Sequence, residues 1–168
     1  MPNTRHLNLS EEDQHRLLEW WQTMESAKPV VHRLISLVSE LRLNPESSHA
    51  DGMILFYRAI SEISYGYAGV RGGVRRAFTK EFGDALKINM VMCISFIPKF
   101  SGDAKVLLER IAKQVTGSSA LQLIQRIREM LKENDIILNR LEKKAHTFIG
   151  KDTFQDIQVK MQKDMIME

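Results

Sequence analysis

The segment from residue 63 to residue 80 has the residue types to bind an anion. It contains no acidic residue. Its basic residues are Arg71, Arg75, Arg76 and Lys80. Its aromatic residues are Tyr65, Tyr67 and Phe78, and three glycines at 69, 72 and 73 would let the backbone approach a partner closely. Because arginine pairs with phosphate and an aromatic ring can stack on a base, the segment predicts a nucleic-acid-binding site formed by these four basic residues.

The position of these cations along the chain strengthens that interpretation. We expect the three glycines to break one helix and a new helix to begin near Val74, so the arginines would lie at a helix start. The helix dipole disfavours positive charge there, which would indicate that the arginines serve a function other than helix stability. An ordinary solvated loop is the other interpretation, and the two are evenly matched on sequence grounds.

A second set of basic residues lies between residues 120 and 148, on the outward face of the helix expected there. Its cations are mixed with Glu129, Glu133, Asp135 and Glu142, which is typical of a solvated helix face. Arg126 and Arg140 are the best candidates there for a second phosphate contact.

No residue pattern indicates catalysis or metal binding. The histidines, none of which has the close spacing of a metal-binding pair, are His6, His15, His32, His49 and His146. The one cysteine, Cys93, stands in an apolar run, where a small core residue is the usual interpretation. There is no P-loop and no dinucleotide-binding glycine motif. We therefore expect no catalytic residue, no metal, no cofactor and no enzyme activity.

Composition limits the class of protein further. The 168 residues are 43% apolar and 27% charged, with a formal net charge of +3, as in many globular domains. One cysteine cannot form an intrachain disulfide, which suits a reducing compartment. The first eight residues lack the apolar stretch of a signal peptide. The run Ile88–Ile97 is about half the roughly 20 residues needed to span a membrane. These features predict a soluble cytoplasmic protein without membrane contact.

Apolar residues recur at helical spacing along nearly the whole chain, which predicts an all-α fold, a helical bundle. Ser10 is the expected N-cap of the first helix, and Pro29 suits the start of a second. A third is expected over about 52–67. Ile88–Ile97 fits either a buried helix or a strand, and we favour a helix ended by Pro98, because no other strand-like segment could pair with it. Ser101 is the next expected N-cap.

The clearest element spans 120–148, where apolar residues alternate by four and three and Gly150 follows. Asp152 is the expected cap of a last helix. We expect a disordered N-terminus at 1–8 and two packed helical subdomains, 9–98 and 99–168.

Several stretches resemble one known family, the CasB-type small subunit of the type I-E Cascade CRISPR complex. Leu17 to Met24, with its paired tryptophans, is similar to that family's opening helix, and Phe56-Tyr57-Arg58 to a Phe-Tyr-Arg in its third helix. Leu123–Ile149 is similar to its basic helix, short break and second helix, with the break near Asn134. Lys151–Lys160 is similar to its closing segment. Thr116–Ser119 departs from the family, which usually has an arginine-rich segment there.

The resemblance implies a non-catalytic, all-α subunit that pairs with other copies of itself and with the other protein subunits of a ribonucleoprotein. Its basic surface would stabilise crRNA and single-stranded DNA in a guide-RNA surveillance complex used in antiviral defence. The alternative function is a helical adaptor or scaffold that binds only protein. In that case Trp20 and Trp21 would anchor an interface, and Asn134 would set the register against a partner helix.

Overall fold

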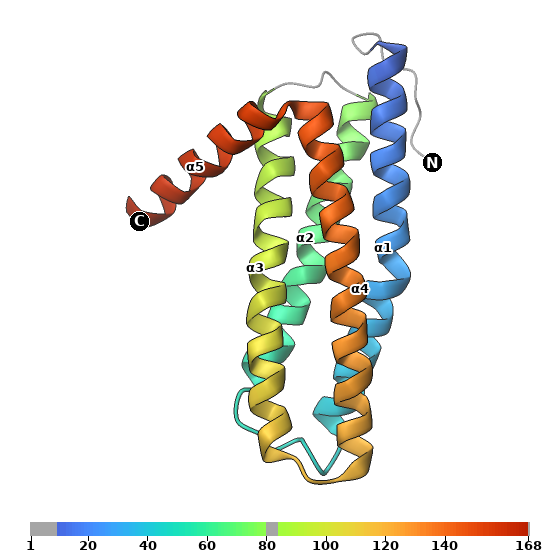
Figure 1. Ribbon diagram of the computed structural model, residues 1–168, viewed down its shortest axis with the longest axis vertical. Helices are drawn as coiled ribbons and strands as arrows, with labels where there is room; N and C mark the ends of the chain where they lie inside the picture. Colours follow the sequence, from blue (N-terminus) through green and yellow to red (C-terminus); the bar gives the residue numbers. More distant parts are fainter. Residues whose placement is uncertain (1–9, 80–83, 168) are drawn as a thin grey trace.

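The computed structural model describes residues 10–79 and 84–167, which form five α-helices and no strand (Figure 1). The helices are α1 (Glu11–Leu43), α2 (Met53–Thr79), α3 (Asp84–Gln114), α4 (Ser118–Ile149) and α5 (Lys151–Met167). The first four form an up-and-down antiparallel bundle in which each helix packs on its neighbours in sequence and α1 closes the ring against α4. The predicted all-α bundle is confirmed.

One core runs the length of the bundle. Leu34, Phe56, Ile97 and Ile127 are fully buried and belong to a single cluster of apolar side chains to which all five helices contribute. The boundary predicted between residues 98 and 99 falls inside α3, and both sides of it contribute to this cluster. Residues 1–8, predicted to be disordered, lie outside the described part of the chain.

The prolines do not end helices where the sequence suggested. Ser10 caps α1 as expected, its Oγ accepting the N–H of Asp13 at 3.1 Å. Pro29, however, lies in the interior of α1, and Pro98 in the interior of α3, so both predicted helix boundaries were wrong. An interior proline costs about 3 kcal/mol. Burial of the apolar stripe on both sides of each proline offsets that cost, because breaking the helix would expose one half of the stripe.

Ser101 is therefore not an N-cap. It is buried within α3, and its Oγ donates a hydrogen bond to Asp135 Oδ1 of α4 at 3.0 Å.

The glycines of α2 also fail to break their helix. α2 continues through 69, 72 and 73 to Thr79, so the predicted end near Tyr67 and start near Val74 were wrong. An interior glycine costs only about 1 kcal/mol against alanine. Gly66 has a packing role, because a Cβ there would collide with the Ile97 side chain of α3.

The predicted helix over 120–148 is confirmed as α4, whose apolar stripe faces the core. Gly150 ends it with a φ of 97° and an N–H that reaches His146 O at 2.9 Å. The break near Asn134 implied by the family resemblance is absent, since α4 runs through it. Ile88–Ile97 is helical, as expected.

The helix α5 leaves the bundle where α4 ends and projects away from it (Figure 1). It begins at Lys151, so Asp152 lies in its first turn and is not its cap. Phe154 is buried edge-on against His146, with ring centroids 4.4 Å apart, and Gln158 Nε2 donates to Ser95 Oγ of α3 at 3.0 Å. Among the described residues, no helix is long and apolar enough to cross a membrane.

Candidate nucleic-acid interface

The predicted basic residues of segment 63–80 lie near the C-terminal end of α2, not at a helix start. Arg71 and Arg75 are on its last turns, and Arg76 is in the final turn by its backbone position. Lys80 lies outside the described residues. The dipole favours cations at a helix C-terminus, so the argument that these arginines are misplaced for stability was wrong.

Both described arginines lie over one indole of α1. The guanidinium carbons of Arg71 and Arg75 are 5.6 and 5.7 Å from the centroid of the Trp21 ring, within cation–π range. Trp20 Nε1 donates to Leu141 O of α4 at 2.9 Å. Both tryptophans are buried in the bundle, so they anchor α1 internally and were wrongly assigned to an external interface.

A carboxylate holds two of the cations together. Glu25 Oε1 accepts from Arg71 at 3.0 Å, and its Oε2 lies 2.9 Å from Lys28 Nζ. The hydrogen bond from Lys28, followed by the charge of Arg71, lowers the pKa of Glu25 despite the opposing effect of burial. Arg75 lies beside this cluster, over the same Trp21 ring as Arg71.

The aromatic residues of the segment divide between core and surface. Tyr67 is buried, and its hydroxyl donates to Asn134 Oδ1 across the bundle at 2.5 Å. Burial, with the nearby charge of Asp135, raises the pKa of Tyr67 well above its usual range, so it remains a protonated donor. The Tyr67 hydroxyl and the Asn134 side chain are therefore not available to a partner, although Tyr67 also lines a hollow between α1 and α2. Tyr65 is 71% exposed, and its ring is available for stacking.

Two adjoining hollows lie between α1 and α2 on the outside of the bundle. The first, about 120 Å³, is lined on its polar side by Lys28, His32, Ser64 and Arg71. The second, about 190 Å³, is lined by Tyr65, Tyr57 and Ser61 among others, and Ser64 belongs to both. We call the two hollows together the α1/α2 groove.

At the far end of the α1/α2 groove, the Arg42 guanidinium lies 4.7 Å from the centroid of the Tyr57 ring. The groove thus joins cations to an exposed aromatic ring, the two features by which proteins hold single-stranded nucleic acid.

Sequence reasoning missed Lys28 and His32 because they lie on a different helix from the arginines. Together with Trp21 and Glu25 they follow the i, i+4, i+7, i+11 spacing of one helix stripe. This spacing can be recognised in the sequence, but it does not indicate which neighbouring helix the stripe faces.

The other predicted contacts are not part of this groove. Arg126 and Arg140 are both exposed on α4, about 21 Å apart along the helix axis. Within the described residues, α4 packs on α1, α3 and α5 but makes no backbone approach to α2 (Figure 1). The two predicted sets of basic residues therefore lie on helices that do not pack on each other.

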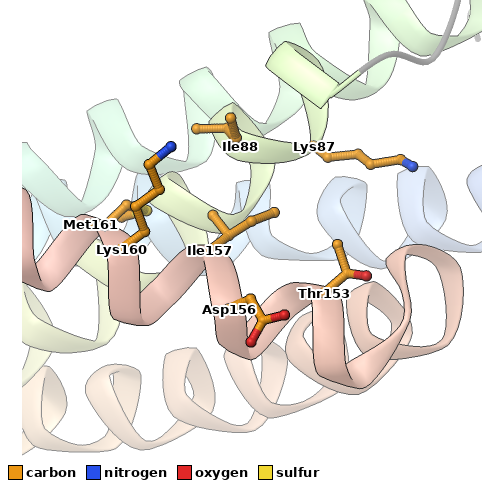
Figure 2. Close-up of a pocket in the computed structure, with 7 residues that line it drawn as sticks. All are labelled: Lys87, Ile88, Thr153, Asp156, Ile157, Lys160 and Met161. Carbon is orange, nitrogen blue, oxygen red and sulfur yellow. The ribbon is translucent and has the colours of Figure 1, made fainter.

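Two larger hollows are mainly apolar. One, about 560 Å³, lies between α2 and α3. Its apolar lining residues are Leu55, Ala59, Phe100, Val106 and Leu107, and its charged ones are Arg58, Glu62 and Asp103. The other, about 470 Å³, lies between α3 and α5. Figure 2 shows Ile88 and Ile157 projecting into the space between these two helices. In the described part of the chain, no three histidine, cysteine or acidic side chains gather as a metal site would need.

Comparison of the chain with protein families, with curated proteins and with solved structures finds no match. The resemblance to the CasB-type small subunit is therefore still an expectation from sequence.

Proposed function

We propose that this protein is a non-catalytic nucleic-acid-binding subunit that holds a single strand in the α1/α2 groove. The observation that supports this best is that the two hollows of the groove adjoin. The first, which we call the cationic hollow because Lys28 and Arg71 line it, shares Ser64 with the second, which lies beside exposed Tyr65. Phosphates would lie at Lys28, Arg71 and Arg75, and a base would stack on Tyr65. Such contacts position a strand without reading its sequence, so little sequence preference is expected.

The resemblance to the Cascade small subunit suggests a cellular context for this activity. The strand would be crRNA or single-stranded DNA, and the protein would act in the cytoplasm beside other subunits of a ribonucleoprotein. This part of the proposal is tested separately, by whether nucleic acid co-purifies with the protein and whether its sequence is that of CRISPR guides.

The groove itself is tested by the salt dependence of binding. Fluorescence anisotropy with labelled single-stranded RNA and DNA, read at several salt concentrations, gives the slope of log affinity against log salt. Three phosphate contacts predict a slope of about −2, at about −0.7 per contact. The double variant Lys28→Gln/Arg75→Gln should weaken binding and make the slope shallower by about 1.4.

The matched control is Arg126→Gln/Arg140→Gln, which removes the same charge from α4. It should keep a slope close to that of the wild type, because its residues lie outside the groove. If the control loses as much slope as the groove variant, binding follows overall charge and the groove is not the site. If neither variant changes affinity, the proposal is wrong.

An adaptor that binds only protein is the second candidate, and one observation favours it. Leu55 and Val106, at the hollow between α2 and α3, are 52% and 67% exposed. An apolar groove between two helices is the usual seat of an amphipathic partner helix. Leu55→Glu/Val106→Glu should then abolish partner capture while leaving oligonucleotide affinity unchanged, and the reverse pattern would exclude this candidate.

A further inference from the structure

The cationic hollow of the α1/α2 groove is too small for a nucleoside, and its lining contains the hydrogen-bond donors and positive charges that an anion needs. Its volume is about 120 Å³, well below the roughly 300–1,000 Å³ of sites that enclose drug-sized ligands. A compact group of that size fits, whereas a sugar and base would have to stay outside.

The lining supplies donors from two helices. Lys28 and His32 come from α1, and Ser64 and Arg71 from α2. Met24, Ala27, Val31, Tyr67 and Ala68 complete the wall. The Lys28 and Arg71 side chains are 39% and 30% exposed, so a ligand can reach them from solvent. Lys28 and Arg71 share one carboxylate, Glu25, so their two positive charges are only half neutralised within the protein.

We propose that this hollow binds the terminal phosphate monoester of a nucleic-acid strand, an inference that rests on the proposed function and makes it specific to strand ends. A terminal phosphate has a charge of about −1.5 to −2 at pH 7 and three acceptor oxygens. The positive charge that Glu25 leaves unneutralised attracts it, and its oxygens can accept from Lys28, Ser64 and Arg71. An internal phosphodiester carries one negative charge and continues as chain on both sides, so it can make fewer of these contacts than a strand end.

Arg75 provides the internal comparison. It lies over Trp21 beside the cluster but does not line the hollow. It should therefore strengthen the binding of any strand, whereas Lys28 and Arg71 should also discriminate a phosphorylated end from a hydroxyl end.

The experiment measures the affinity of four versions of one single-stranded oligonucleotide, with 5′-phosphate, 5′-hydroxyl, 3′-phosphate or 3′-hydroxyl ends. One phosphorylated end should bind the wild-type protein about tenfold or more tightly than its hydroxyl counterpart, the factor expected for hydrogen bonds to a charged group. Comparing the 5′ and 3′ pairs shows which end is held. Inorganic phosphate should compete for the phosphorylated oligonucleotide more than for the hydroxyl one.

Three single variants test whether the phosphorylated end binds in the cationic hollow. Lys28→Gln should remove most of the preference for the phosphorylated end, and Arg71→Gln should do the same provided that its circular dichroism melt shows a folded protein. Arg75→Gln should weaken all four oligonucleotides by a similar factor and keep the preference.

Equal affinity of the wild-type protein for phosphorylated and hydroxyl ends would overturn the inference and leave the proposed function standing. A preference that survives Lys28→Gln would also overturn it. Failure of every oligonucleotide to bind would overturn both.

Discussion

A buried hydrogen bond between two diagonal helices should couple the stabilities of the residues that form it. Tyr67 of α2 donates to Asn134 of α4 at 2.5 Å in the centre of the bundle. Asn134 is completely buried and Tyr67 is 6% exposed, so water cannot replace either partner. We expect the single variants Tyr67→Phe and Asn134→Leu to destabilise the protein, and the double variant to be more stable than the additive sum predicts.

The magnitudes follow from what each change leaves behind. Tyr67→Phe strands the buried Asn134 Oδ1, which costs about 1–3 kcal/mol. Asn134→Leu strands the Tyr67 hydroxyl but also removes the Asn134 Nδ2 group, which already lacks a hydrogen-bond partner, so its cost should fall at the lower end of that range. Replacing both partners leaves no stranded polar group, and the double variant should lie within about 1 kcal/mol of the wild type.

Urea denaturation followed by circular dichroism measures this cycle, with an unchanged m-value as the condition for comparing the variants. The coupling free energy should exceed about 1 kcal/mol. If the double variant loses as much stability as the two single variants combined, the bond contributes nothing specific and the reasoning fails.

Three further predictions concern packing and charge. Leu131→Ala should lower the free energy of unfolding by about 2–5 kcal/mol, because the side chain is buried; a loss below about 0.5 kcal/mol in urea denaturation would show that the stripe is not core. Gly66→Ala should lower the free energy of unfolding by about 1–3 kcal/mol in the same assay, because a Cβ there collides with the Ile97 side chain of α3. Gly72→Ala, which has open space around it, should be neutral or stabilising, and equal effects of the two variants would contradict the close approach at Gly66. The hydrogen bond from Arg128 lowers the pKa of Glu109, so the ionised carboxylate stabilises the fold above its ordinary pKa of 4.5 by less than about 1 kcal/mol, and this contribution is lost as the pH falls further. Glu109→Gln should therefore flatten the decline in melting temperature between about pH 5 and 3, and an unchanged decline would refute the prediction.

The sequence by itself determined the helical class and the inward face of α4. The stripe of α4 could be assigned residue by residue, because the 3.6-residue period of apolar side chains depends only on local geometry. Ser10 and Gly150 marked helix ends correctly for the same reason, since a cap acts within one turn.

Local signals failed where tertiary packing outweighed them. Pro29, Pro98 and the glycines of α2 each disfavour a helix by a few kcal/mol at most, and burial of a continuous stripe against the neighbouring helices exceeds that cost. The sequence does not record the length of the stripe that a bundle can bury, because that length depends on the partner helices.

The candidate site was decided almost entirely by the pairing of helices. Periodicity shows that Lys28 and Arg71 lie at the edges of their own apolar stripes, but not that α1 and α2 place those edges side by side. It also cannot show that Tyr67 turns inward to Asn134 while Tyr65, two residues earlier, points to solvent in the groove. These contacts join residues far apart in the chain, and only the packing of the bundle brings them together.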